Sequence, residues 1–351
     1  MLSSLSSNVV LAKARAKYCK RLKEKDYRNL LDCKSVAEVA AYLKANTDYH
    51  DVLTGINEYD IHRGQLEVLI KQKLFYNLSS FVRYELSVGE QLADYVIARA
   101  EIEEILDALM LMSAGRQEEY SQAAPLYLAK HTKIHMEQFS SIQTYGEFLD
   151  ALGSSVYRRL LAPFEPKPGE PVDVFAVENQ LYSYLFSHVQ EIIDHRVRGK
   201  TKKEVRELFQ GYIDLENYAR IIRMKKRFRA HPEFIEKNLL PFGSLKPKQL
   251  NALIHAETAN QAAAIFRTTS RGKKTANVEY NFVDELAQRI KFISGKHYIH
   301  FSSHPPVVLL SYIFLADTEV HNITTIVEGI RYQVSVDDIK KLLILPTDKA
   351  G

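Results

Sequence analysis

Two sets of histidines in this chain have spacings that resemble those of metal ligands. His188, Glu191 and His195 share one face of a predicted helix, at steps of three and four residues. A metal site in a helix bundle would also need a second helix with a Glu-x-x-His motif, and the sequence has none. His131 and His135 are four residues apart, but no His-Glu-x-x-His accompanies them. Ordinary surface histidines are therefore favoured, and a metal-dependent enzyme that uses the first set stays open as an alternative.

The phosphate-binding and nucleophile motifs of common enzyme classes are absent. The sequence has no Gly-x-x-x-x-Gly-Lys-Ser/Thr loop, no Gly-x-Gly-x-x-Gly and no Gly-x-Ser-x-Gly. Residues 270–275 have the basic end of a phosphate loop without its first glycine, which predicts a plain basic loop. We therefore expect no catalytic residue, no bound metal and no cofactor, and a protein that is not an enzyme.

Positive charge is concentrated between His195 and His231. This stretch has twelve Lys or Arg residues against four acidic ones, and half of these cations lie near the end of a predicted helix over 202–229. One or two cations are enough for a helix dipole. The excess indicates contact with an acidic protein, a nucleic acid or lipid headgroups, unless the helix end is simply solvated. The predicted partner-binding residues are Arg220, Arg223, Lys225, Lys226 and Arg227.

Long helices are predicted to position these side chains. The 14 glycines and 11 prolines among 351 residues are well below average usage. No sustained alternation of polar and apolar residues predicts strands. Apolar residues at helical spacing predict long helices, and Ser335 is a predicted N-cap for a final one. The predicted long helices span residues 65–86, 92–112, 174–198, 202–229, 279–292 and 306–329. These patterns predict an all-α protein.

Two short patterns recur at about one third of the chain length. The first is an aliphatic pair followed by a short amphipathic helix, at residues 30–43 and 253–266, with a looser version at 145–161. The second is an acidic residue, an apolar residue, any residue and then Asn or Glu, at 101–104, 214–217 and 319–322. Such a period predicts repeated structural units. We predict three helical repeat units, over residues 1–120, 121–235 and 236–351.

Charge, cysteine content and hydropathy indicate a cytosolic protein. The formal net charge of +4 implies no strong field for polyanions over the whole chain. The two cysteines, Cys19 and Cys33, match no metal spacing and indicate a reducing compartment. No apolar run reaches the roughly 18 residues of a membrane span.

The segment 214–226 resembles the C-type stalk protein of bacterial and archaeal V-type (A-type) rotary ATPases, which corresponds to the d-type protein of the eukaryotic proton pump. Residues 14–43 and 306–341 are also similar to this family, so the resemblance covers essentially the whole chain. Only the second repeat has the full family signature, because Met110 and Glu328 stand where Arg223 stands in that repeat. One asymmetric basic contact is therefore expected.

The resemblance implies a funnel-shaped socket of three helical domains related by pseudo-threefold symmetry. Such a protein would be a non-catalytic part of the central stalk, peripheral to the cytoplasmic face of the membrane through protein contacts. One copy would couple the central shaft (D and F type subunits) to the proteolipid c or K ring. It would transmit torque for ATP-driven proton or sodium transport, or for ATP synthesis. The alternative is an unrelated helical-repeat adaptor that binds an acidic protein or RNA.

Overall fold

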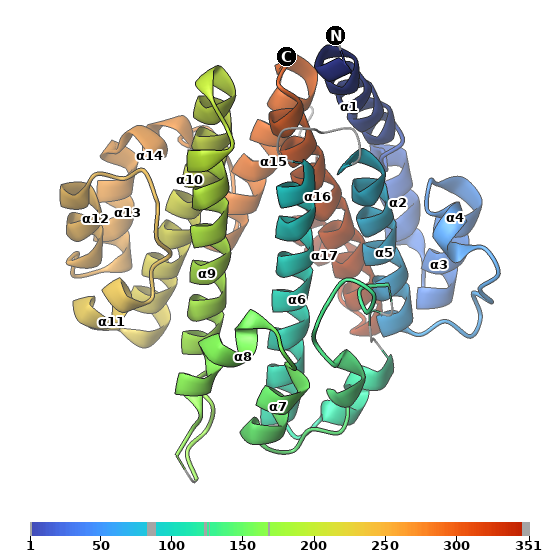
Figure 1. The fold of residues 1–351 in the computed structure, drawn as a ribbon, viewed down its shortest axis with the longest axis horizontal. Coiled ribbons are helices and arrows are strands. Elements are labelled where there is room, and N and C mark those ends of the chain that lie inside the picture. Colours follow the sequence, from blue (N-terminus) through green and yellow to red (C-terminus); the bar gives the residue numbers. More distant parts are fainter. Residues whose placement is uncertain (1, 83–88, 123–124, 126, 168, 346–351) are drawn as a thin grey trace. The chain divides into compact units, whose positions relative to one another are not determined.

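The computed structural model describes residues 2–82, 89–122, 125, 127–167 and 169–345. Within this part of the chain every regular element is a helix, which confirms the predicted all-α class (Figure 1). The chain forms two compact units, one of residues 1–185 with 316–351 and one of residues 186–315. Helices α9 (Val174–His195) and α16 (Pro305–Arg331) each contribute residues to both units.

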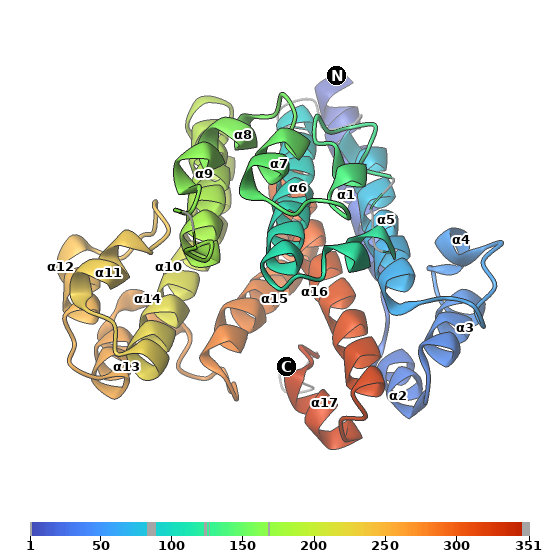
Figure 2. The same ribbon diagram turned by 90° about the horizontal axis from the view of Figure 1, so that it is seen from below.

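The larger unit brings the two ends of the chain into one hydrophobic core. Leu30, Leu43 and Leu66 from early helices pack in the same cluster as Ile326 and Ile339 from the last two. In Figure 2 the end of α16 and α17 (red) lie near α2 (blue). Besides parts of α9 and α16, the helices of this unit are α1 (Leu2–Cys19), α2 (Glu24–Asp32), α3 (Val36–Asn46), α4 (His50–Leu53), α5 (Arg63–Val82), α6 (Gly89–Ser113), η1 (Gln117–Gln122), η2 (Met136–Gln138), α7 (Tyr145–Ala151), α8 (Val156–Leu161), η3 (Ala162–Phe164) and α17 (Val336–Leu342).

The smaller unit is built around helix α10 (Gly199–Arg223). This helix packs along α15 and also contacts α12 and α13, so that α11–α14 form a group beside it (Figure 1). A five-residue π-helix, η4 (Met224–Phe228), continues α10 directly. The other helices that begin in this unit are α11 (Pro232–Lys237), α12 (Pro247–Ile254), α13 (Ala259–Thr268), α14 (Ser270–Lys274), α15 (Val283–Phe301) and α16.

The predicted long helices are present, but the bounds of several differ from the prediction. The helix predicted over 279–292 begins at Val283 and extends to Phe301. The helix predicted over 202–229 begins at Gly199 and keeps α-helical form only to Arg223. Residues 270–274, predicted as a loop, form a helix because the Thr269 side chain accepts a hydrogen bond from the Gly272 amide and caps its start. The predicted cap Ser335 is confirmed, since its hydroxyl accepts from the Asp338 amide. Residues 83–86 of the helix predicted over 65–86 lie outside the described part.

Candidate partner-binding site

In the second copy of the acidic motif, residues 214–217, the acidic residue Asp214 is buried in α10 and binds a distant loop. Asp214 Oδ1 accepts hydrogen bonds from the backbone amides of Ser244 (2.7 Å) and Leu245 (3.1 Å). Its other oxygen accepts from the Ser244 hydroxyl and lies 3.4 Å from Arg271 Nε. A buried carboxylate is tolerated only when its charge and lone pairs are satisfied. Asp214 therefore holds the segment that leads into α12 against α10.

The asparagine of the motif makes the same pair of hydrogen bonds in two places. Asn217 Nδ2 donates to the Leu240 carbonyl at 2.8 Å, and its Oδ1 accepts from the Leu240 amide at 2.7 Å. Asn322 does the same with the carbonyl and amide of Ile344, at 3.0 and 2.9 Å. Both side chains are buried. Each side-chain amide thus pairs with non-helical backbone shortly after a short helix, α11 or α17.

In the third copy of the acidic motif, residues 319–322, the acidic residue Glu319 binds the N-terminal part of the chain. Glu319 Oε2 accepts from the Leu22 amide at 2.7 Å, and Oε1 accepts from the Tyr49 hydroxyl at 2.9 Å. Leu22 precedes α2, as Leu245 precedes α12 in the second motif. Burial raises the pKa of Glu319 to about 7. The last long helix of the chain is therefore bonded to the first short helices.

The first copy of the acidic motif, residues 101–104, has an acidic residue at both its first and its fourth position. Glu101 accepts from the hydroxyls of Thr132 (2.6 Å) and Tyr157 (2.8 Å), and Glu104 accepts from the Tyr120 hydroxyl at 2.8 Å. Burial raises the pKa of both carboxyls, that of Glu104 to about 7. Hydroxyl donors rather than backbone amides hold this motif.

These three residue pairs hold the fold together, and we call them anchors. The first, second and third anchors are Glu101 with Glu104, Asp214 with Asn217, and Glu319 with Asn322. Each anchor lies on a long helix, and the chain also has three short helices with similar caps. The caps are Ser35, Thr144 and Thr258, each of which accepts a hydrogen bond from the amide three residues later. The short pattern predicted from the sequence is thus a repeated helix start.

Two of the five predicted partner-binding residues are engaged inside the smaller unit. Arg220 is 4% exposed, and its Nη1 donates to the Asn238 carbonyl at 3.0 Å. Lys225 Nζ donates to the carbonyls of Ile254 (2.7 Å) and Ala256 (2.6 Å), and burial lowers the pKa of this lysine. These carbonyls lie at the C-terminal end of α12, where helical partners are missing. Both cations therefore hold the fold together.

The other three predicted residues lie at the surface. Arg223 Nη1 is 3.1 Å from a carboxylate oxygen of Asp284. Lys226 and Arg227 are exposed in the π-helix and form no ion pair within the described residues. We call residues 224–229 the basic turn. Its last two residues, Phe228 and Arg229, are exposed too, and the sequence prediction omitted them although an aromatic residue inside a basic run was visible.

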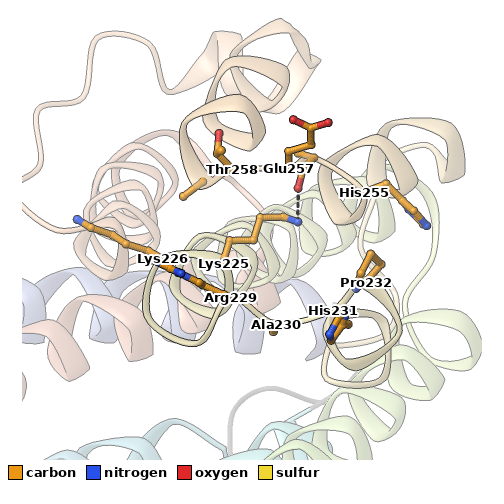
Figure 3. A pocket seen from close by; sticks show the side chains of 11 residues that line it. Lys225, Lys226, Arg229, Ala230, His231, Pro232, His255, Glu257 and Thr258 are labelled. Atoms are coloured by element: carbon orange, nitrogen blue, oxygen red, sulfur yellow. Dashed lines mark hydrogen bonds between the residues drawn. The ribbon is translucent and has the colours of Figure 1, made fainter.

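An open depression of about 400 Å³ lies beside the basic turn. Lys226, Arg229, His231 and His255 contribute to its walls, together with the segment that leads into α13. Figure 3 shows the Lys225 ammonium turned toward a backbone carbonyl, away from Lys226 and Arg229. Lys225 is thus bonded to backbone carbonyls, whereas Lys226 and Arg229 line the depression without such bonds. Glu257 is the acidic residue among those that line it.

The candidate metal ligands do not assemble into a site in the described residues. His188 Nδ1 lies 4.0 Å from the Glu191 carboxylate, and His135 Nδ1 lies 3.6 Å from that of Glu137. Across the described ranges, no group of three His, Cys, Asp or Glu side chains is placed to hold a metal ion. None of the described helices has both the length and the apolar character that crossing a bilayer requires.

Comparison with known proteins identifies a family for nearly the whole chain. The model of the family described as ATP synthase (C/AC39) subunit matches residues 10–342. The C subunit of the A-type ATP synthase of Methanosarcina acetivorans is 26% identical over 300 residues, covering 81% of this chain and 72% of that protein. The C subunit of the A-type ATP synthase of Methanosarcina mazei is 23% identical over 360 residues, covering 97% of this chain and 94% of that protein. The chain therefore belongs to the ATP synthase (C/AC39) subunit family.

Proposed function

We propose that this protein is a non-catalytic central-stalk subunit that couples the shaft of a rotary ATPase to its membrane ring. Its partners would be the D and F type shaft subunits and the proteolipid c or K ring. The observation that carries the proposal is the family match over residues 10–342. One copy per complex would lie at the cytoplasmic face of the membrane, attached through protein contacts.

Torque transmission requires a body that does not deform under load, and the anchors supply stiffness. Five of the six anchor side chains each make two or more hydrogen bonds to segments outside their own long helix, and Glu104 makes one. Breaking such a bond leaves a buried polar group unsatisfied, which costs about 1–3 kcal/mol. Segments held this way resist sliding along the long helices.

The predicted division into three helical domains, 1–120, 121–235 and 236–351, remains part of this proposal. Three anchors and three similarly capped short helices support a threefold repeat. Each anchor also bonds a segment of another predicted domain, so the anchors would tie the three domains together. Three such domains around an axis would form the funnel-shaped socket that a shaft needs. Ion transport or ATP synthesis would then be served mechanically, without a nucleotide, metal or cofactor on this subunit.

Partner contact is assigned first to Lys226 and Arg227, with Arg223 beside them. The reason is that these side chains are at the surface, whereas Arg220 and Lys225 donate to backbone carbonyls within the smaller unit. Arg220 and Lys225 would act indirectly, by fixing the shape of the helix end that presents the other three.

Binding to purified partners tests the proposal. The chain would be combined with the D and F type subunits, and separately with the detergent-solubilised ring, of its own organism. We expect wild-type protein to bind both. Charge reversal in a Lys226→Glu/Arg227→Glu variant should weaken binding at least tenfold, while the matched Lys130→Glu/Lys133→Glu variant, also at exposed lysines, should bind normally.

The outcomes separate the coupling role from its rival. A folded wild-type chain that binds neither partner would reject the coupling role. If it instead bound RNA with an affinity that fell steeply with salt, the adaptor alternative would take its place. Equal binding by both charge-reversed variants would reject only the assignment of Lys226 and Arg227.

A further inference from the structure

The three long helices that carry the anchors end in the same way. Gly115, Arg229 and Gln333 follow α6, the π-helix after α10, and α16, and all three have positive φ (66°, 46° and 54°). A left-handed residue after a helix is a common C-terminal cap, and glycine is preferred there because it has no Cβ. Only the first helix has glycine at this position. The second helix has an arginine there, which is an unfavourable choice for the backbone.

The second helix is one residue longer than the other two between its anchor and its cap. Gly115 lies 14 residues after Glu101 and Gln333 lies 14 after Glu319, but Arg229 lies 15 after Asp214. The anchor asparagines show the same difference, because their backbone partners lie 23 residues later in the second repeat and 22 in the third. Both spans contain residues 217–229 in the second repeat and 322–333 in the third, so they register the same extra residue in the second repeat.

The backbone hydrogen bonds place the extra residue in the basic turn. The bond that closes the helix end joins Arg116 N to Leu111 O, and Val334 N to Gly329 O, a span of five residues. In the second repeat Ala230 N donates to Met224 O, a span of six. The extra residue is accommodated as the π-helix 224–228. Single π-turns of this kind are frequent at functional sites.

The charge of the turn differs between the repeats as much as its geometry. Residues 111–115 carry no charge, and residues 329–333 carry one cation, Arg331. Residues 224–229 carry four cations, of which only Lys225 is bonded to backbone carbonyls. Phe228 lies in sequence among the other three cations, and its side chain is 70% exposed. Its counterpart Tyr332 is 66% exposed but lies under the Arg331 guanidinium at 5.5 Å.

We propose that the basic turn and the depression beside it form a docking site for an acidic segment of a partner protein. Phe228 would contact an apolar side chain, and carboxylates would bind Lys226 and Arg229. The inference rests on the proposed function and extends it, because it names the chemistry of the partner surface. Exposed aromatic and arginine side chains around a depression are typical of binding hot spots.

A protein partner fits these observations better than a polyanion. Exposed Glu257 lines the depression together with the cations, and Glu233 and Glu236 are exposed on α11, which begins three residues after the basic turn. The whole chain has a net charge of only +4. A nucleic acid or a lipid surface presents uniform negative charge and would be repelled by these carboxylates. A protein segment can place acidic and apolar groups where each one fits.

Variants of the turn test the inference in the assembly experiment described above. Arg229→Gly removes a charge while giving the left-handed position its preferred residue, so its melting temperature should equal or exceed that of the wild type. Its affinity for the shaft or ring partner should nevertheless fall at least tenfold, as should that of Phe228→Ser. The matched controls Gln333→Gly and Tyr332→Ser alter the equivalent turn of the third repeat and should bind like the wild type.

Deletion of Arg227 tests the extra residue itself, since it restores the spacing of 14. The deleted chain should keep its helical circular dichroism and lose partner binding. Wild-type affinity in folded Arg229→Gly and Phe228→Ser proteins would overturn the inference and leave the coupling role intact. Equal losses in the third-repeat controls would also overturn it. A wild-type chain that binds neither partner would reject the coupling role first.

Two further probes distinguish the class of ligand. Wild-type protein and the Arg229→Gly variant would be titrated with phosphatidylserine vesicles and with poly(U) RNA. Weak binding of both proteins to either probe, without a difference between them, supports a protein partner. A tenfold loss with Arg229→Gly on vesicles or RNA, together with unchanged binding to the protein partners, would overturn the inference.

Discussion

The second and third anchors make similar hydrogen bonds, but they join parts of the chain that are separated by very different numbers of residues. Asp214 reaches Ser244 over 30 residues, within one continuous stretch of chain. Glu319 reaches Leu22 over 297 residues, between the two ends of the chain. Closing a longer loop costs more conformational entropy, although the cost grows only slowly with length. A repeated unit therefore need not be continuous in sequence, because its buried hydrogen bonds define it.

The largest expected effect comes from removing the anchor asparagines. Asn217→Ala and Asn322→Ala each leave a backbone amide and carbonyl without their buried partners, and should each destabilise the protein by about 2–4 kcal/mol. Urea unfolding measures the loss, and exposed Asn46→Ala should cost less than about 0.5 kcal/mol. A loss at Asn322 as small as at Asn46 would break the equivalence of the two anchors.

Glu319 predicts a dependence of stability on pH. Its folded pKa of about 7 exceeds its ordinary value of 4.5, so the folded state binds more protons than the unfolded state between these values. Titration of Glu319 alone should lower the free energy of unfolding by about 2–3 kcal/mol as pH rises from about 5 to 8. Glu319→Gln should flatten this slope, although Glu104, with a similar pKa, keeps part of it. Unfolding in urea at both pH values measures the slope, and an unchanged slope in the variant would contradict the prediction.

Lys225 lies 11 residues after Asp214, and the residue 11 after Glu319 is the uncharged Ile330. The second repeat therefore has cationic hydrogen bonds to backbone carbonyls that a side chain at position 330 cannot make. Lys225→Ala removes hydrogen bonds to two carbonyls and should cost about 1–2 kcal/mol. Lys226→Ala, at an exposed neighbour, should change stability by less than about 0.5 kcal/mol. Thermal unfolding of the two variants measures both effects. Equal losses would show that the two lysines do not divide into a structural and a surface role.

The smallest expected effects concern the repeated helix caps. Ser35→Ala, Thr144→Ala and Thr258→Ala each remove one capping hydrogen bond, which should cost about 1 kcal/mol. Hydrogen exchange of the first-turn amides in α3, α7 and α13 would report the fraying locally. Similar increases in exchange at all three sites would support equivalent caps, whereas an effect at one site only would argue against a common role.

Much of the fold was predictable from local sequence, and most of the candidate site was not. The helical spacing of apolar residues and the Ser335 cap depend on residues only a few positions apart. They can therefore be predicted without knowing the rest of the structure. Arg220 looked like a surface cation because it lies in a basic run, yet it is buried against Asn238. Phe228 and Arg229 were omitted although they lie in the same basic run, and the π-helix that contains Phe228 is not visible in the spacing of apolar residues.

The amino-acid sequence by itself determined the helices, the threefold recurrence of its motifs and its membership of a family. These properties depend on residue type and spacing along the chain, which are local and additive. Only the tertiary structure decided what each charged side chain does. A carboxylate becomes an anchor when a distant hydrogen-bond donor lies within about 3 Å of it. A cation remains available to a partner when no backbone carbonyl or carboxylate lies that close. The hydrogen-bond partners of Glu319 are 270 and 297 residues away, and those of Lys225 are 29 and 31 residues away.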